Sequence, residues 1–372
     1  MIVKESTLDN ELTFTRFDRM SEVYPNRPAV MYLGETFSYR RLRELSERFA
    51  GGLQALGVKK GDRVMIYIPN CIQWIIGFLA IQKIGAVLVP ISPIYTSFEI
   101  EYMIKDAGVE TVICQDTNFC YVKEVLPTTG LKRIIVTNLA DLLSPWKKVL
   151  GVLFDRIPNG KVERDSQVLW FKSLLKHPPL KEKVALDPWK DLSYILYTVV
   201  TTGFPKGVPG NHIGMTSYVN DVTEDVAGQY LKEGEDVYLA VNPLFHIMAL
   251  GLFMAVGLNK GNLTLLMPVP QVDAILECVQ RYRARWMLGV PALYRMILEN
   301  DRLDRYDLSS LTYCYCGGDV LPVEVFHRWK KHTGVQIYQV YGSTEAGHVT
   351  YSRIGREPKP NTIGEPLRSR RC

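Results

Sequence analysis

A run of hydroxyl, glycine and lysine residues follows a β-prone apolar segment near the middle of the chain. Residues 194–200 are mostly apolar, and residues 201–207 read Thr-Thr-Gly-Phe-Pro-Lys-Gly. Thr201 and Thr202 can donate hydroxyl hydrogen bonds, while Gly203 and Gly207 let backbone N–H groups approach a ligand and Lys206 adds a mobile positive charge. We therefore predict a strand that leads into a polyphosphate-binding loop. A strand ending in a plain polar turn is the alternative, and the pattern does not fit a Walker A loop.

A second run with suitable chemistry, Tyr-Gln-Val-Tyr-Gly-Ser-Thr-Glu, occupies residues 338–345. It predicts a strand, then a glycine turn at Gly342, then two side chains that face a ligand. The Glu345 carboxylate is a hard oxygen ligand suited to Mg²⁺, and the Thr344 hydroxyl can bond a phosphate oxygen. Taken alone, a glutamate after a strand is also typical of a solvated helix N-terminus.

Two further segments could line a binding site. In Cys316-Gly317-Gly318-Asp319, the glycines would let a planar base lie flat on the backbone, although they also suit a tight strand-to-helix turn. His246 follows Asn-Pro-Leu-Phe, and a lone histidine among apolar neighbours is often only a core residue. The apolar residues 248–254 predict either the wall of a tunnel or a packed helix.

The elements expected to position these residues alternate between strands and helices. Apolar residues at helical spacing predict a helix over residues 42–56 that ends at Gly57, and the Thr96-to-Glu99 spacing predicts a capping box. Short connections between such elements imply an α/β fold with mainly parallel sheets. The expected strands are residues 63–68, 86–89, 110–114, 133–137, 237–241, 263–267, 286–290, 311–316 and 336–340. The expected helices are residues 14–24, 72–84, 96–106, 146–154, 272–283 and 322–331.

Composition is that of an ordinary globular protein. The 372 residues carry a formal charge of +5 without a dense basic block, so we expect no nucleic-acid partner. The seven cysteines form no metal-ligand spacing and indicate reduced thiols in a cytoplasmic protein. The longest apolar stretch, residues 72–89, is interrupted by polar residues. It favours a core helix and a buried strand over a membrane span, which leaves at most peripheral membrane contact.

The two chemical runs together resemble signatures of the adenylate-forming superfamily, which includes acyl-CoA synthetases. That family's phosphate loop is Tyr-Thr-Ser-Gly-Thr-Thr-Gly-x-Pro-Lys-Gly-Val, and its second motif is Tyr-Gly-x-Thr-Glu. Residues 85–90 and 363–366 are similar to two further family segments. The resemblance implies two stacked β/α lobes, roughly residues 1–185 and 186–372, plus a small β-rich region, as in the large N-terminal domain of an acyl-CoA synthetase.

The resemblance also implies roles for individual residues. Glu345 would hold Mg²⁺ on ATP, Thr344 would meet the α-phosphate, and Tyr341 would lie against the adenine. The segment ending at His246 resembles one that lines the acyl pocket, and residues 286–295 resemble a segment of fatty-acyl members. The expected catalytic residues are Thr344, Glu345 and Lys206, and the expected nucleotide-binding residues are Thr201, Thr202, Gly203, Lys206, Gly207, Gly317, Gly318, Asp319, Tyr341, Gly342 and Thr344.

The sequence departs from the family pattern in two ways. Val199 and Val200 stand where the family has a small residue and glycine, and a valine at positive φ costs about 1–3 kcal/mol. Few residues follow residue 366, so we expect the small C-terminal domain with its catalytic lysine to be missing. The implied activity is ATP-dependent conversion of a fatty acid to acyl-CoA, with Mg²⁺ and CoA, slowed in this chain. The resemblance is also compatible with a homodimer. The alternatives are a silent nucleotide- or acyl-binding remnant and an aryl- or amino-acid adenylation domain.

Overall fold

A computed structural model describes residues 11–147, 157–163, 165–180, 183–198 and 204–367. The chain forms two compact units, each with its own sheet. The first unit comprises residues 1–15 and 40–214, and the second comprises residues 16–39 and 215–372. The first unit therefore extends beyond residue 185, because two strands after that point join its sheet, while residues 16–39 join the sheet of the second unit.

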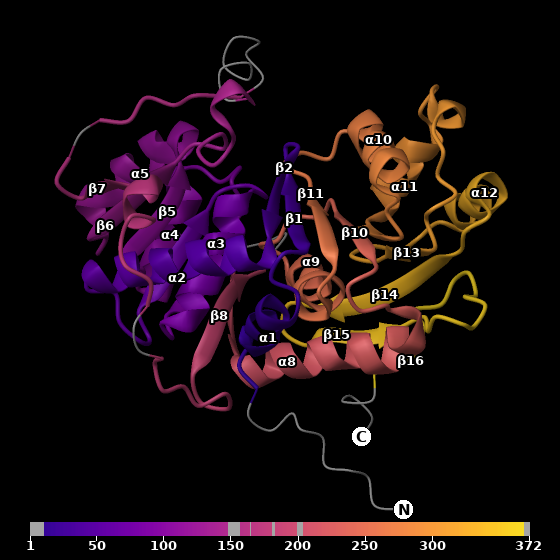
Figure 1. The fold of residues 1–372 in the computed structure, drawn as a ribbon, viewed down its shortest axis with the longest axis horizontal. Coiled ribbons are helices and arrows are strands. Elements are labelled where there is room, and N and C mark those ends of the chain that lie inside the picture. Colours follow the sequence, from indigo (N-terminus) through magenta and orange to yellow (C-terminus); the bar gives the residue numbers. More distant parts are fainter. Residues whose placement is uncertain (1–10, 148–156, 164, 181–182, 199–203, 368–372) are drawn as a thin grey trace, which may run out of the picture. The chain divides into compact units, whose positions relative to one another are not determined.

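The first unit contains a seven-stranded sheet in the order β7-β6-β5-β3-β4-β8-β9 within the described residues (Figure 1). Neighbouring strands are parallel except β8 and β9, which form an antiparallel pair. The strands are β3 (Arg63–Tyr67), β4 (Val87–Pro90), β5 (Thr111–Gln115), β6 (Arg133–Thr137), β7 (Val168–Trp170), β8 (Leu192–Tyr197) and β9 (Gly207–Asn211). The predicted parallel α/β sheet is confirmed.

Helices of the first unit follow the apolar periodicity of the sequence. They are α2 (Tyr39–Ala55), α3 (Ile72–Lys83), α4 (Ser97–Ala107), α5 (Phe119–Val125), α7 (Phe171–Leu174) and the short 3₁₀ turns η1 (Asp116–Asn118) and η2 (Leu126–Thr128). The predicted capping box of α4 is present, with the Glu99 carboxylate accepting from the Thr96 amide at 2.8 Å. Every residue of α3 is buried, including Gln82, whose amide group donates to the carbonyl oxygen of Ser193. The predicted core helix over this apolar stretch is thus confirmed.

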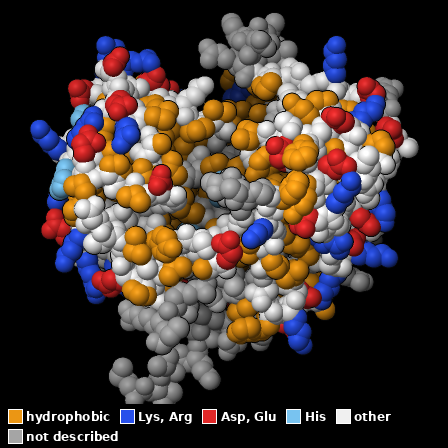
Figure 2. All heavy atoms as spheres, turned by 180° about the vertical axis from the view of Figure 1, so that it is seen from behind, with side chains coloured by type: hydrophobic (Ala, Val, Ile, Leu, Met, Phe, Trp, Pro, Cys, Tyr) orange, Lys and Arg blue, Asp and Glu red, His pale blue; other side chains and the backbone are white. Residues whose placement is uncertain are grey.

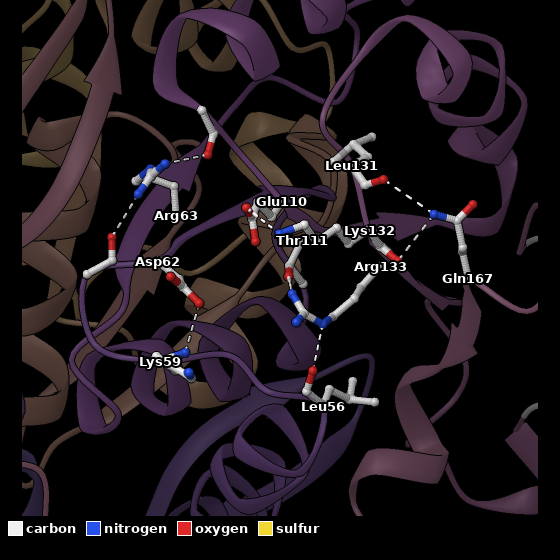
Figure 3. A network of polar contacts seen from close by, with 12 residues as sticks. Leu56, Lys59, Asp62, Arg63, Glu110, Thr111, Leu131, Lys132, Arg133 and Gln167 are labelled. Atoms are coloured by element: carbon white, nitrogen blue, oxygen red, sulfur yellow. Dashed lines mark hydrogen bonds and ion pairs between the residues drawn. The ribbon is translucent and has the colours of Figure 1, made fainter.

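Arginines hold the amino-terminal ends of the first unit's parallel strands together (Figure 3). The Arg133 guanidinium donates to the Leu56 carbonyl oxygen at 2.7 Å and to the Thr111 hydroxyl at 3.2 Å, so it joins β6 to β5 and to the end of α2. Arg63 at the start of β3 donates to the carbonyl oxygens of Ala107 and Gly108 after α4, both at 2.8 Å. These bonds fix the strand ends opposite the edge where β8 leads into the loop.

The second unit contains a nine-stranded sheet in the order β16-β15-β14-β13-β12-β10-β11-β1-β2 within the described residues (Figure 1). The strands from β14 to β1 are parallel, whereas β2, β15 and β16 run antiparallel to their neighbours. The strands are β1 (Pro28–Tyr32), β2 (Glu35–Ser38), β10 (Val237–Ala240), β11 (Leu263–Leu266), β12 (Trp286–Gly289), β13 (Tyr313–Cys316), β14 (Ile337–Ser343), β15 (Gly347–Tyr351) and β16 (Glu365–Pro366).

Helices of the second unit pack their apolar residues against this sheet. Ile275, Leu276 and Val279 of α10 join Trp329 of α12 in one buried cluster with the strands. The α-helices are α1 (Thr15–Val23), α8 (His212–Asn220), α9 (Ile247–Leu252), α10 (Val272–Tyr282), α11 (Pro291–Leu298) and α12 (Val323–Thr333). π-Helical turns η3 (Asp221–Ala227) and η5 (Phe253–Gly257) continue α8 and α9, and 3₁₀ turns η4 (Gly228–Tyr230), η6 (Leu258–Lys260) and η7 (Leu303–Arg305) follow.

The surface in Figure 2 carries basic and acidic side chains intermingled with apolar ones. Because the two signs alternate on this face, no extended field of one charge forms there. None of the helices in the described part of the chain has the length and apolar character needed to cross a membrane. Most of the helix predicted over residues 146–154 lies outside the described residues.

Candidate functional site

The second unit contains a cavity of about 540 Å³ next to the hairpin of β14 and β15. Its walls come from the start of α9, the first turns of α11, the loop after β13 and this hairpin, and most of them are apolar. A cavity of this size and character suits a small organic ligand. The lining residues are Val241, Asn242, Pro243, His246, Ile247, Met248, Ala249, Pro270, Val290, Ala292, Leu293, Met296, Gly318, Val340, Gly342, Ser343, Thr344 and His348.

The Tyr-Gly-Ser-Thr-Glu run forms the end of a β-hairpin. β14 continues to Ser343 and the turn covers residues 344–346, so the predicted glycine turn at Gly342 is wrong. Gly342 pairs with His348 on β15, and a Cβ atom at Gly342 would lie 2.3 Å from the Gly347 carbonyl oxygen. A glycine is needed here because the two strands approach closely at a bulge, not because the chain turns there.

Thr344 and Glu345 stand together in the hairpin turn. Thr344 is half-buried and lines the cavity, whereas Glu345 is exposed. The Glu345 carboxylate makes no hydrogen bond or ion pair with the residues that the structure describes. A single free carboxylate fits Mg²⁺ that is held mainly by substrate phosphates and water, which is the usual situation for this ion in nucleotide sites. Tyr341, at the end of β14, is half exposed.

The Gly317-Gly318 pair connects β13 to α12 next to the same cavity. Gly318 lines the cavity and has φ +86°, a conformation that other residues rarely adopt. Gly317 is buried beneath Val340, whose Cγ1 would lie 2.6 Å from a Cβ atom at Gly317. Asp319 is exposed, and its carboxylate accepts from the Val320 amide at 2.7 Å. The strand-to-helix turn is therefore present, and Gly318 leaves the cavity wall without a side chain at that point.

His246 occupies the N-cap position of α9, without a capping hydrogen bond from its side chain, and lines the cavity. The residue is exposed, its ring lies 4.4 Å from that of Phe245, and partial desolvation by neighbouring residues lowers the pKa of the imidazole below its ordinary value. At neutral pH the side chain is therefore an uncharged hydrogen-bonding group. Residues 247–252 form a packed helix, and residues 247–249 at its start also line the cavity.

The lysine and glycine of the mid-chain run belong to the first unit. Lys206 is exposed, and Gly207 begins β9 opposite Tyr197 of β8. The ring of Phe204 stacks on Tyr102 of α4 at 4.5 Å between centroids. Thr201, Thr202, Gly203, Val199 and Val200 lie outside the described residues. The structure thus gathers His246, Gly318, Gly342 and Thr344 at one cavity of the second unit and places Lys206 and Gly207 at a hairpin of the first.

His348 is the main lining residue that sequence reasoning missed. It lies on β15 and is 3% exposed. His348 is followed by Val349, Thr350 and Tyr351, residue types that are enriched in strands, and this signal could have extended the motif by one hairpin. Met296 was missed as well, although the preceding residues 286–295 were singled out.

Comparison with known proteins identifies the group of proteins to which this geometry belongs. A sequence model described as AMP-binding enzyme matches residues 17–372. A long-chain-fatty-acid–CoA ligase of Bacillus subtilis is 30% identical over 355 residues, which are 92% of this chain and 62% of that relative. The chain therefore spans about three fifths of that relative's length.

Two solved structures share the fold. The crystal structure of an anthranilate CoA ligase in complex with anthranoyl-AMP has a TM-score of 0.83 and 22% identity, and the match covers 99% of this chain and 66% of that one. A long-chain-fatty-acid-CoA ligase from Archaeoglobus fulgidus has a TM-score of 0.80 and 23% identity, with 96% and 69% of the two chains covered. Since the family model spans nearly the whole sequence, this chain belongs to the AMP-binding enzyme family.

Proposed function

We propose that the chain carries the nucleotide- and acid-binding part of a ligase that activates fatty acids with ATP and transfers them to CoA. In the first step a carboxylate oxygen attacks the α-phosphorus of ATP. The bond from that phosphorus to the bridging oxygen breaks, and pyrophosphate leaves with the electron pair. In the second step the CoA thiolate attacks the acyl carbon of the acyl-adenylate, and AMP leaves.

The observation that carries this proposal is the combination of two surfaces in one cavity. Thr344 and Gly342 of the Tyr-Gly-Ser-Thr-Glu hairpin line one part of it, and apolar side chains of α9 and α11 such as Met248, Leu293 and Met296 line another. A cavity of about 540 Å³ can take an acyl group, and the hairpin supplies polar groups for the reacting end. The neutral His246 side chain can orient a carboxylate without adding a competing charge.

Three residues are assigned to the polyphosphate. We assign the free Glu345 carboxylate to Mg²⁺, which supplies positive charge to the phosphate oxygens when bound. Thr344 would donate its hydroxyl hydrogen to an α-phosphate oxygen. We also assign the exposed Lys206 to the phosphates, with backbone N–H groups near Gly207 as further donors. The Val199-Val200 pair is expected to slow this chain relative to relatives with a small residue and glycine there.

Acid-dependent pyrophosphate exchange tests the proposal. Labelled pyrophosphate, ATP and Mg²⁺ are incubated with the chain and with straight-chain fatty acids, aryl acids or amino acids in parallel. Exchange that requires a straight-chain acid supports the ligase. Binding of AMP or acyl groups without exchange supports a silent remnant, and exchange with only aryl or amino acids supports an adenylation domain of that class. His246→Ala should reduce the exchange, whereas His327→Ala on the exposed side of α12 is the matched control.

A further inference from the structure

A chain of three side chains leads from the protein interior to the cavity of the second unit. The hydroxyl groups of Tyr218 on α8 and Tyr351 on β15 are 2.9 Å apart, and the Tyr351 hydroxyl also bonds Nδ1 of His348. The Tyr218 ring packs on the imidazole with 4.2 Å between centroids. All three side chains are buried, and the imidazole is held by a hydroxyl at Nδ1 and by a tyrosine ring tilted by 60° against it.

The other ring nitrogen of His348 has no such bond. Nε2 is buried and lacks a hydrogen-bond partner among the residues that the structure describes. His348 itself lines the cavity and Tyr351 occupies its Nδ1, so Nε2, which is covered in this structure, is the ring nitrogen left for a ligand once neighbouring side chains shift. A buried polar atom without a partner destabilises a protein unless something else fills the vacancy.

The direction of the hydrogen bonds from Tyr218 through Tyr351 to His348 indicates whether Nε2 carries the ring hydrogen. If Tyr218 donates to Tyr351 and Tyr351 donates to Nδ1, both hydroxyl hydrogens are used and Nε2–H is the one donor left over. In the opposite direction, the Tyr218 hydrogen and the Nε2 lone pair would both be left without a partner. The first arrangement leaves fewer buried groups unsatisfied and is the favoured one. Burial lowers the pKa of His348 to about 3, so the ring is neutral and carries one N–H.

The rest of the cavity wall makes this donor selective. Ile247, Ala249, Leu293 and Met296 offer only apolar contact, and the buried lining residue Asn242 already has an interaction of its own. A plain alkyl chain would fill the apolar space and leave Nε2–H without an acceptor. The lining includes Met248 and Met296, whose flexible side chains can move when a ligand enters the cavity.

We propose that His348 is a specificity-determining residue whose Nε2–H donates to an oxygen atom on the chain of the substrate acid. The preferred substrate would then be an aliphatic carboxylic acid that carries an oxo, hydroxyl or ether oxygen beyond its carboxylate. This inference rests on the proposed function, because it describes the acid that enters the same cavity. Sites built to bond a polar group discriminate strongly against substrates that lack it, since a buried donor is left unpaired.

The test compares decanoate with a positional series of oxo-substituted decanoates on the full chain, by calorimetric binding and by pyrophosphate exchange. One position of the oxo group should improve binding or exchange by about tenfold or more over decanoate. His348→Phe should reduce that ratio to within about twofold, and His348→Gln, which retains an N–H donor, should restore part of it. His327→Phe on α12, which does not line the cavity, is the control and should keep the ratio.

Three results would overturn the inference. Equal use of all the decanoates by the unaltered chain would do so without any variant. If His348→Phe lowered binding or exchange equally for every acid, Nε2 would contact the carboxylate or the adenylate. If the ratio between oxo-decanoate and decanoate were unchanged in this variant, Nε2 would stay covered when the substrate binds. These results differ from a failure of the proposed function, in which the unaltered chain would neither bind nor exchange any of the acids.

Discussion

The backbone amide of Thr198 donates a hydrogen bond to the carbonyl oxygen of Lys206 at 3.0 Å. This bond continues the antiparallel ladder of β8 and β9 and closes the neck of the predicted phosphate loop. The Lys206 amide also lies 3.4 Å from the Thr198 hydroxyl oxygen that accepts from it. The backbone of Lys206 is therefore fixed by the strand pair, while its exposed side chain is left for a ligand.

Lys206→Ala should reduce pyrophosphate exchange about 10- to 100-fold, because a positive charge assigned to the phosphates is lost. The Lys206 side chain makes no hydrogen bond or ion pair with the described part of the chain, so the free energy of unfolding should change by less than about 0.5 kcal/mol. Exchange kinetics and urea unfolding measure the two quantities. Lys176→Ala, an exposed lysine of the same unit, is the control. An unchanged exchange rate would remove Lys206 from the site.

Glu345→Gln should raise the Mg²⁺ concentration needed for half-maximal exchange, because a neutral amide is a much weaker ligand for a hard cation. We expect a shift of about tenfold, measured by Mg²⁺ titration at fixed ATP. Glu277→Gln on the exposed side of α10 should leave the titration unchanged. If Glu345→Gln and Glu277→Gln need the same Mg²⁺ concentration for half-maximal exchange, the Glu345 carboxylate does not bind the metal.

Much of the fold could be predicted because apolar periodicity and local caps agree with it. The capping box at Thr96 and the buried run of α3 are signals that short stretches of sequence contain. The close pairing of Gly342 with His348 is different, since it depends on two strands meeting at a bulge. A glycine in such a pair has the same sequence signature as a glycine in a turn.

The candidate site was only partly predictable for the same reason. Motif residues such as His246 and Thr344 could be found in the sequence, and the cavity brings them together. His348 escaped because its importance depends on Tyr218, which is far away in the sequence, and on an unpaired nitrogen. Residues 16–39 likewise join the second sheet through β1 and β11, a long-range pairing that no local pattern indicates.

Arg285→Ala should destabilise the second unit by about 2–3 kcal/mol at pH 7, because Arg285 pairs with the fully buried carboxylate of Asp236. This loss of stability is smaller than that expected for a fully buried ion pair, since the Arg285 side chain is 27% exposed. Urea unfolding measures the loss, with Arg281→Ala as the exposed control.

The loss of stability caused by Arg285→Ala should depend on pH. Burial already raises the pKa of Asp236, and loss of Arg285 should raise it further. A carboxyl group whose folded pKa is raised favours the folded state at low pH and loses that effect as pH rises. The destabilisation by Arg285→Ala should therefore shrink as the pH falls from about 7 towards about 4. A constant difference across this range would contradict the role of the buried charge.

The titration of His348 changes the free energy of unfolding with pH in the direction opposite to that of Asp236. Its folded pKa of about 3 lies below the ordinary value of 6.5, so the unfolded chain binds a proton first as the pH falls. The stability that depends on the neutral ring is present above pH 6.5 and is lost progressively towards pH 3. His348→Phe should flatten the pH dependence of unfolding by about 1.4 kcal/mol per pH unit between about pH 6 and 4. Urea unfolding against pH tests this, with His327→Phe for comparison.

Replacing Val200 by glycine and Val199 by serine should raise the rate of acid-dependent pyrophosphate exchange. The related family pattern has a small residue and glycine at these two places, and the Thr198–Lys206 bond joins the described residues on either side of them. Valine at a position that needs positive φ costs about 1–3 kcal/mol, which corresponds to a gain of roughly 5- to 150-fold when glycine replaces it. Val23→Ser, at an exposed valine of α1, should have no such effect. If the double variant exchanges no faster than the unaltered chain, the two valines do not limit phosphate binding, and the expected slowing must have another origin.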